Sequence, residues 1–388
     1  MAPPEVRIAR PGFGLPINHD PSHAFPHAIG DYVVSGGITL RERRMLDFIT
    51  QISDKPDWDR KVLDQEIVAK WKSEACRFDE SCQDDFLSEP MFEYCIAELR
   101  EKALVHQEKG FITVMDCEAA VAKSDSAVAE SLRHSLMQAV RPLEDVPDRL
   151  KDWHPGSNQM GVKWARPEVD DDPSGAEEND KDWADMHGFW DQYNDWWEQH
   201  RVLKQPEPLE FKYFSGGPKA SEKQAIDLRS DYKESGLQII FKLANIHLTP
   251  ENPEYNSSNW HVEGALNEHI CATAIYYYDS ENIGPSHLAF RQSIDSEDMI
   301  MRPEQNEYSS TCAYFGIENE EAAIQNLGKV STHQGRLLAF PNIMQHQVQP
   351  FRLADPTKPG HRKILTMFLV DPHIPILSTA NVPPQRKD

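Results

Sequence analysis

The chain has 388 residues, enough for one large domain with elaborations or for two ordinary domains. Its 40 Lys and Arg residues against 63 Asp and Glu residues give a formal net charge of −23, so its long-range field repels polyphosphates and anionic lipids and argues against nucleic-acid and membrane partners. The N-terminus lacks a basic start followed by an apolar core and no run approaches about 18 apolar residues, which predicts a cytoplasmic protein without a membrane span.

The N-terminal half is predicted to be mainly helical. Residues 1–40 are rich in Pro, Gly and His and are expected to form an extended arm. Apolar residues then recur three and four positions apart, which predicts helices over 60–71, 91–100 and 127–137. Asp79 or Ser88 is suited to begin the helix that contains Pro90, because a short polar side chain caps free N–H groups and Pro is tolerated in the first turn.

An acidic segment separates the two halves of the chain. Residues 168–195 are rich in Asp, Glu and other polar residues, and a run of this kind repels itself and buries no core. We therefore expect a surface loop or lid. A cluster of aromatic residues begins within it, and a helix packing its Trp face against the core is a better interpretation than a binding platform. The cluster comprises Trp183, Phe189, Trp190, Tyr193, Trp196 and Trp197.

The C-terminal half is predicted to be β. Short runs rich in β-branched and aromatic residues, separated by Gly, Pro, Asn or Asp, predict strands over 237–246, 270–278, 286–291, 335–340 and 363–370. The absence of crossover-length helices between them favours an antiparallel sandwich or barrel. The expected organisation is α+β, with a helical region over 1–205 and a β region over 206–388 packed as one unit.

Two histidines and one glutamate form the predicted metal site. His261 and Glu263 lie two positions apart, and on a strand such residues point to the same face. His346, directly after a predicted strand far downstream, supplies a third ligand from a neighbouring strand. Two imidazoles and one carboxylate on one side of a metal form the facial triad of non-heme iron(II) oxygenases, which leaves open positions for a cosubstrate and O₂.

Other residues compete for this role. The same spacing occurs at His106 and Glu108, but in a helical pattern, where positions i and i+2 lie about 200° apart around the axis. His269 is the alternative third ligand, although eight residues of continuous strand would place it about 26 Å from His261. Only a sharp turn at Gly264 would bring it back.

A cosubstrate such as 2-oxoglutarate would need a buried cation for its far carboxylate. Arg362 begins the last predicted strand, and a guanidinium offers two parallel charge-assisted hydrogen bonds. Thr366 shares its face by alternation and is expected to add a hydroxyl to the same carboxylate. The alternative, Arg352, falls in a predicted loop and is less rigidly placed. Tyr276 is the expected aromatic contact of the cosubstrate.

Substrate contacts are also expected beside the metal. A small amino-acid substrate would need a cation for its carboxylate, and Arg291 and Arg336 are candidates, although both are more often ordinary strand-surface arginines. Ile343, just before His346, is expected to shape an apolar wall.

Several long stretches resemble a mainly fungal family of domains of unknown function whose members look like Fe(II)/2-oxoglutarate-dependent oxygenases. The stretches that carry the resemblance are residues 237–255, Trp-His-Val-Glu-Gly at 260–264, Ala-Ile-Tyr-Tyr-Tyr-Asp-Ser-Glu-Asn at 274–282 and Leu-Ala-Phe-Arg at 288–291. The resemblance implies a double-stranded β-helix, or jelly roll, with helical buttresses. It also implies Fe(II), 2-oxoglutarate and O₂ as cofactors, with His261, Glu263 and His346 as ligands and Arg362 as anchor.

The implied reaction is oxidation of an unactivated C–H bond of a small-molecule substrate. The chain looks similar to oxygenases that convert valine-type amino acids to aziridines, so an aliphatic amino acid is the expected substrate, with hydroxylation or ring closure as outcomes. A 2-oxoglutarate-independent cupin-like metalloenzyme and a non-catalytic jelly-roll binding protein are the alternatives. A homodimer is compatible with the sequence.

Overall fold

Several helices in the N-terminal half begin at residues whose side chains cap the first turn. The Thr39 hydroxyl accepts from the Glu42 amide (3.1 Å) and the Glu42 carboxylate accepts from the Thr39 amide (2.7 Å), forming a capping box. Ser88 caps the helix that has Pro90 in its first turn, as predicted. The four helices of this region are α1 (Leu40–Ile52), α2 (Trp58–Lys61), α3 (Gln65–Ala75) and α4 (Glu89–Lys109).

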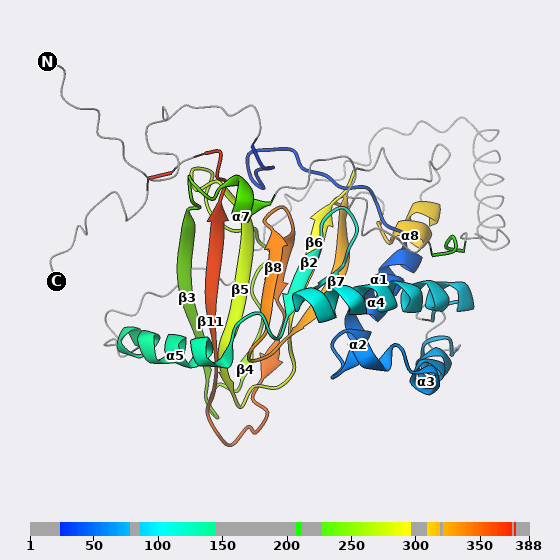
Figure 1. Ribbon diagram of the computed structural model, residues 1–388, viewed down its shortest axis with the longest axis horizontal. Coiled ribbons are helices and arrows are strands. Elements are labelled where there is room, and N and C mark those ends of the chain that lie inside the picture. Colours follow the sequence, from blue (N-terminus) through cyan, green and yellow to red (C-terminus); the bar gives the residue numbers. More distant parts are fainter. Residues whose placement is uncertain are drawn as a thin grey trace, which may run out of the picture. The chain divides into compact units, whose positions relative to one another are not determined.

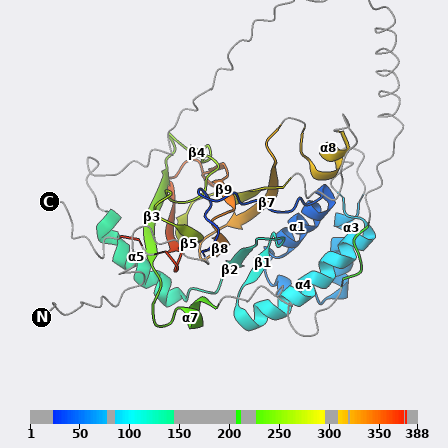
Figure 2. The same ribbon diagram turned by 90° about the horizontal axis from the view of Figure 1, so that it is seen from above.

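The predicted single helix over 60–71 is wrong, because the chain is divided there. Asp64 accepts from the amides of Glu66 (2.9 Å) and Ile67 (3.2 Å) and so starts a new helix, α3, after α2 has ended. Figure 2 shows α1 and α4 side by side. They lie next to the strands β7 (Ile324–Thr332) and β1 (Ile112–Val114). Three further helices are α5 (Glu130–Glu144), α7 (Leu228–Asp231) and α8 (Ser309–Phe315).

The computed structural model describes residues 24–77, 86–144, 207–211, 227–295, 309–318, 321–374 and 376–377. By its contacts the chain divides into two compact units, residues 1–151 with 207–388 and residues 152–206. All described residues belong to the first unit. The predicted acidic loop over 168–195 and its aromatic helix lie outside the described residues, as does Asp79. Among the described helices, none is long and apolar enough to cross a membrane.

Antiparallel pairing joins all the strands that the structure describes (Figure 1). The six-stranded sheet has the order β1 (Ile112–Val114), β2 (Val121–Ser124), β8 (Leu337–Pro341), β5 (Ile270–Glu281), β11 (Gly360–Val370) and β3 (Ile239–Leu248). The three-stranded sheet has the order β7 (Ile324–Thr332), β6 (Ser286–Ser293) and β9 (Gln345–Val348), and a short ribbon pairs β10 (Phe351–Arg352) with β4 (Glu254–Tyr255). The prediction of mixed helices and antiparallel sheets is thus confirmed. Two strands from the helical half, β1 and β2, form the edge of the larger sheet.

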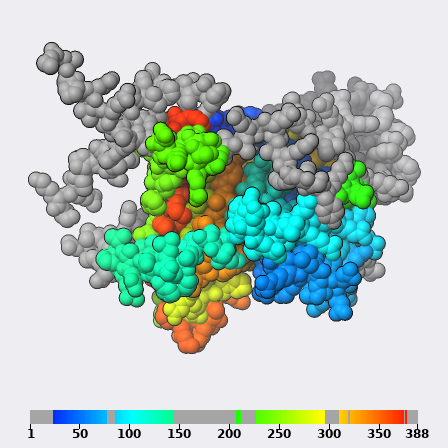
Figure 3. All heavy atoms as spheres, viewed as in Figure 1, coloured from blue at the N-terminus to red at the C-terminus, as the bar shows by residue number. Residues whose placement is uncertain are grey.

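Alternation along β11 separates an inner from an outer face. Arg362, Thr366 and Phe368 are buried on the inner face. On the outer face Lys363 binds Glu144 (2.9 Å), which ends α5. Figure 3 shows α5, in teal, lying across the lower part of this face.

An ion-pair network joins the helical region to the sheet. Arg336, only 2% exposed, donates to both carboxylate oxygens of Asp125 (2.7 Å each) and to Asp54 (2.6 Å), which also binds Lys123 (2.6 Å). Arg336 also donates to the carbonyl of Ser331 (3.0 Å). The expectation that Arg336 binds substrate is therefore wrong: its guanidinium is engaged by two carboxylates and a carbonyl inside the protein.

Replacing Asp125 by Asn is expected to lower the free energy of unfolding by about 1–2 kcal/mol near pH 7. Burial alone would raise the pKa of Asp125, but hydrogen bonds from Arg336 and His333 and their charges outweigh it and hold the pKa well below its ordinary value. A depressed carboxyl pKa stabilises the fold at neutral pH; this contribution is intact above the ordinary carboxyl pKa of about 4 and is lost as the pH falls below it toward the lowered pKa of the folded state. Urea unfolding of wild type and Asp125→Asn at pH 7, 4 and 3 should therefore show a difference that is largest at pH 7 and narrows below pH 4. Glu108→Gln, an exposed site on α4, is the control, and a difference independent of pH would contradict the assignment.

Candidate metal centre

Three side chains from two segments of the chain converge on one point. His261 and His346 face each other in a single antiparallel bridge, in which each amide donates to the other residue's carbonyl (3.1 and 2.9 Å). Directly opposite residues of an antiparallel pair point to the same side, and the two ring centroids are 4.4 Å apart. Glu263 Oε1 lies 3.3 Å from His346 Nε2 and 3.8 Å from His261 Nε2. Ligand atoms of all three residues lie within 4.8 Å of one another, and this is the one such group of three among the residues that the structure describes.

Each imidazole is oriented so that Nε2 faces the point of convergence. His261 Nδ1 lies 2.7 Å from the carbonyl of Asn259, which assigns the proton to Nδ1 and leaves the Nε2 lone pair free. His346 is 2% exposed and packs against the rings of Phe290 and Phe340 at centroid distances of 6.4 and 4.9 Å. Its Nδ1 has no hydrogen-bond partner within the described ranges.

Protonation of the cluster suits a divalent cation. Burial, together with the charge of His346, lowers the pKa of His261, so its imidazole is neutral at pH 7. Burial would raise the pKa of Glu263, but its hydrogen bond with His346 and the neighbouring charges hold the pKa below its ordinary value. A neutral imidazole and an ionised carboxylate are the forms that bind metals.

Asn342 fixes Glu263 in place and was missed by the sequence analysis. Its side-chain oxygen accepts from the Glu263 amide (2.8 Å), and its amide group donates to the carbonyls of Glu263 and Ile270 (2.9 Å each). The side chain is 2% exposed, so these bonds are shielded from water. The only signal in the sequence was an Asn in the turn that ends a predicted strand, which is ordinary turn chemistry.

Arg362 lies buried on the inner face of β11 without an acid to pair with. It is 3% exposed, and its Nε and Nη1 atoms have no hydrogen-bond partner among the described residues. Its guanidinium carbon lies 4.6 Å from the ring centroid of Phe351 and 5.5 Å from that of Tyr277. Burial lowers its pKa, yet an arginine stays charged in proteins. An unpaired buried guanidinium is suited to binding an anion.

Tyr276 was the wrong choice among the three adjacent tyrosines. It packs with Tyr278 and with Val140 and Leu136 of α5, on the outer face of the sheet. Tyr277 points the other way, into the main core and against Arg362. Alternation correctly placed Tyr277 on the opposite face from Tyr276 and Tyr278. It did not show which of the two faces is covered by α5 and which faces the main core.

Arg291 does not face the candidate metal ligands. In the pairing of β6 with β9, Phe290 stands opposite His346 and Arg291 stands opposite Gln345, so Arg291 projects from the other face of the sheet. There its Nε donates to Gln345 (2.8 Å) and its guanidinium lies over the Trp260 ring at 4.6 Å. The expectation that Arg291 binds substrate is therefore wrong. Ile343 is partly buried and packs against the main core.

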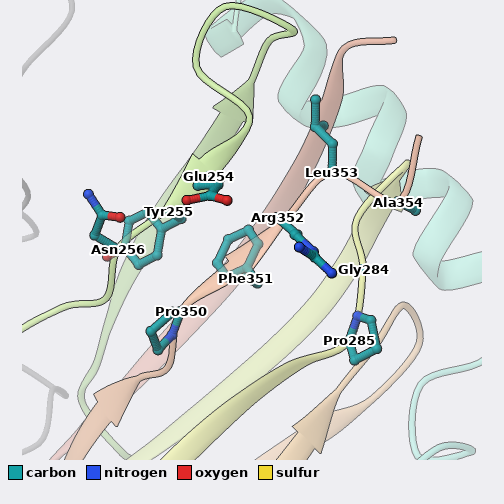
Figure 4. A pocket seen from close by; sticks show the side chains of 10 residues that line it. All are labelled: Glu254, Tyr255, Asn256, Gly284, Pro285, Pro350, Phe351, Arg352, Leu353 and Ala354. Atoms are coloured by element: carbon teal, nitrogen blue, oxygen red, sulfur yellow. The ribbon is translucent and has the colours of Figure 1, made fainter. Parts of the chain in front are cut away.

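An open pocket lies beside this region but contains none of the three candidate ligands. It is lined by the β4 and β10 ribbon and by the turn before β6 (Figure 4). Phe351 lines this pocket and also contacts the Arg362 guanidinium. Tyr255 stacks on the Phe351 ring at a centroid distance of 5.1 Å. Arg352, the alternative anchor, is exposed at the pocket rim.

Comparison with known proteins finds one family over most of the chain. The family described as "Protein of unknown function (DUF4246)" matches residues 89–169 and 162–388, and its N-terminal domain matches residues 10–74. No protein of curated function matches the chain significantly.

Solved structures show weaker likenesses. The selenomethionine-labelled Fe(II)/(alpha)ketoglutarate-dependent dioxygenase TqaL is 16% identical over 37% of this chain and 44% of its own, with a TM-score of 0.21, so the chain spans less than half of that protein's length. A prolyl-4-hydroxylase of Pseudomonas putida is 12% identical over 65% of this chain and 93% of its own, with a TM-score of 0.26. AviO1 from Streptomyces viridochromogenes Tue57 is 11% identical over 52% and 89%, with a TM-score of 0.20. At such low TM-scores these likenesses do not establish a shared fold.

Replacing His261, Glu263 or His346 by Ala is expected to abolish stoichiometric binding of Fe(II), because each supplies one of three donors within 4.8 Å. Anaerobic isothermal titration calorimetry measures this directly. His134→Ala removes an imidazole that is 60% exposed on α5 and should bind metal as the wild type does. Unchanged affinity in any of the three ligand variants would remove that residue from the site.

Asn342→Leu keeps the side-chain size and removes three hydrogen bonds around Glu263. We expect metal affinity to fall about 10–100-fold, as for other residues that orient ligands. The same titration measures this, and circular dichroism checks that the variant is folded. A folded variant with wild-type affinity would show that Glu263 is held by other contacts.

Proposed function

The chain belongs to the DUF4246 family, and we propose that it is a non-heme Fe(II)- and 2-oxoglutarate-dependent oxygenase that acts on an unactivated C–H bond of a small metabolite. The observation that carries the proposal is the convergence of His261, Glu263 and His346 on one point. The buried and unpaired Arg362 supports it.

The donor set suits iron(II). Two imidazole nitrogens and one carboxylate oxygen on one side of a metal leave the remaining positions open, which is the arrangement of non-heme iron(II) oxygenases. Iron(II) bound with 2-oxoglutarate and O₂ would supply the oxidant for the C–H bond. The role of the three side chains is to hold the ion, with His261 oriented by the Asn259 carbonyl and Glu263 by Asn342.

Arg362 suits the far carboxylate of 2-oxoglutarate. Its Nε and Nη1 atoms have no partner among the described residues and are free to donate charge-assisted hydrogen bonds to an anion, and the flanking rings of Phe351 and Tyr277 restrict the guanidinium plane. Thr366 shares this face four residues further along β11, about 13 Å between backbones at 3.3 Å per residue. We assign the carboxylate chiefly to Arg362, with Thr366 as the proposed hydroxyl contact on the same face.

The wall beside His346 is apolar. Phe290 and Phe340 are fully or almost fully buried, and both rings contact or approach His346. The His261 side chain is 40% exposed, so the candidate site has one apolar, rigid side and one side open to an incoming ligand. The apolar side strengthens the charge interactions of Glu263.

We also propose that the two sheets form a double-stranded β-helix. Along the chain, β3, β5, β8 and β11 belong to one sheet, and the His261 segment, β6, β7 and β9 alternate with them in the other. Among these eight segments, each one changes sheet relative to the one before it, except at the hairpin of β6 and β7. This alternation in an eight-stranded, two-sheet arrangement is typical of jelly rolls.

For the substrate we propose a small aliphatic amino acid such as valine, oxidised by hydroxylation or by ring closure to an aziridine. The sequence resemblance supports this choice. Incubation with Fe(II), 2-oxoglutarate and a panel of free amino acids, scoring succinate release coupled to each, identifies the substrate. If larger metabolites alone stimulate succinate release, the amino-acid assignment is wrong.

The proposed cosubstrate role predicts the effect of Arg362→Met. We expect the Kd of 2-oxoglutarate for the Fe(II)-loaded protein to rise at least about 10-fold, because a charge-assisted contact to its far carboxylate is lost. The charge-transfer absorbance of the anaerobic complex reports binding. Arg352→Met, on the neighbouring strand, is the matched control and should stay within about twofold of wild type. If Arg352→Met has the larger effect, the anchor is Arg352, and if 2-oxoglutarate does not bind wild type, the proposed function is wrong.

A further inference from the structure

We infer that Lys242 binds the carboxylate of the substrate, on the inner face of the large sheet and apart from the anion held by Arg362. This inference deepens the proposed function and rests on it. It names the substrate class as a small metabolite that carries a carboxylate.

Strand register places Lys242 inside. In the pairing of β3 with β11, Lys242 stands directly opposite Thr366, and Ile240 stands opposite Phe368. Directly opposite residues share a face, and Thr366 and Phe368 are buried on the inner one. The neighbours of Lys242 in sequence confirm the alternation, because Phe241 is 66% exposed on the other side. A lysine at this position therefore extends toward the interior.

Lys242 lies close enough to the candidate ligands to act on them electrostatically. Its positive charge contributes to the lowered pKa of His261, after burial and the charge of His346. It also contributes to the lowered pKa of Glu263, where burial acts in the opposite direction. No hydrogen bond or ion pair engages its ammonium among the residues that the structure describes, although the protein carries an excess of carboxylates. Two other buried cations, unlike Arg362, are engaged: Lys123 binds Asp54 and Arg336 binds Asp125. An inward ammonium without a partner is suited to binding an anion from solution.

Arg362 and Lys242 are spaced for two anions. Lys242 is opposite Thr366, so the backbone positions of the two cations differ by four residues along the strands, about 13 Å. The five-carbon chain of 2-oxoglutarate spans only about 5 Å between its end carbons, with C–C bonds of about 1.5 Å. We assign its far carboxylate to Arg362 and Lys242 to a second molecule.

Charge balance also favours a substrate with a carboxylate. One ionised Glu263, a divalent metal, a doubly charged cosubstrate and Arg362 sum to zero, so Lys242 leaves one positive charge without a counter-ion beside it. A substrate carboxylate would pair with that ammonium directly, and an amine on the same substrate would have to point away from it. The hydroxyl of Thr273, buried and without a hydrogen-bond partner in the described part of the chain, lies on the same face, two strands across and two residues along, about 12 Å away between backbones, and offers a further polar contact.

The test measures binding rather than turnover. Protein loaded with Mn(II) and 2-oxoglutarate is titrated anaerobically, by calorimetry, with isovalerate, L-valine and L-valinamide. We expect the two carboxylates to bind wild type, Lys242→Met to weaken them at least about 10-fold, and Lys242→Arg to stay within about threefold. Valinamide should bind weakly and respond little to either substitution. Lys233→Met, an exposed site after α7, is the control and should behave as wild type.

The outcomes separate this inference from the proposed function. In Lys242→Met the Kd of 2-oxoglutarate should stay within about twofold; an increase as large as that for isovalerate would assign Lys242 to the cosubstrate and overturn the inference. Failure of both carboxylates to bind wild type, or equal binding by wild type and Lys242→Met, would overturn it too. If 2-oxoglutarate itself does not bind wild type, the proposed function fails, whatever Lys242 binds. Preserved circular dichroism and the Lys242→Arg variant exclude misfolding as the cause.

Discussion

Two backbone hydrogen bonds between His261 and His346 are the interaction on which the candidate site depends. They make the two residues direct partners, so their imidazoles leave the backbone on the same side. Glu263 then follows two residues after His261, and Asn342 fixes its backbone from a turn near His346. The metal site is thus a consequence of pairing between two segments that are far apart in sequence.

The interior of the large sheet contains charges that the protein does not neutralise with its own carboxylates. Burying a cation in a protein is unfavourable unless it is paired, and the fold pairs Arg336 and Lys123 fully. Arg362 and Lys242 differ from them, since both face inward along β11 and β3 and neither contacts an acid among the described residues. Arg336 and Lys123, which bind carboxylates of the protein, thus stabilise the fold. Arg362 and Lys242 are instead suited to binding ligands.

Periodicity predicted what depends on a single strand. The inward face of β11, with Arg362 and Thr366, followed from alternation alone. His261 and Glu263 converge as predicted, but not on a strand: His261 forms an isolated bridge and Glu263 lies in a bend after it. Choices that depend on a neighbouring element failed: Tyr276 faces α5, and Arg291 stands opposite Gln345 rather than His346.

Apart from the third ligand, His346, features defined by pairing between distant segments were not predicted. The inward position of Lys242 follows only from its pairing with Thr366. The role of Asn342 follows only from its hydrogen bonds to Glu263. The β7 strand, Ile324–Thr332, was missed because Asn, Gly and Lys interrupt its apolar pattern. The helix boundary at Asp64 was missed because the apolar period continues across a cap.

The buried network around Arg336 makes the helical region inseparable from the sheets. Asp54 follows α1, Lys123 belongs to β2, and Arg336 precedes β8, so the charges that compensate one another come from both halves of the chain. A deletion that removed the first 144 residues would leave a guanidinium stranded in an apolar interior, besides stripping two strands from the sheet edge. Evolutionary recombination could not therefore exchange the helical portion as an independent module, and any transplant of the metal-binding half must carry the residues around Asp54 and Asp125 with it.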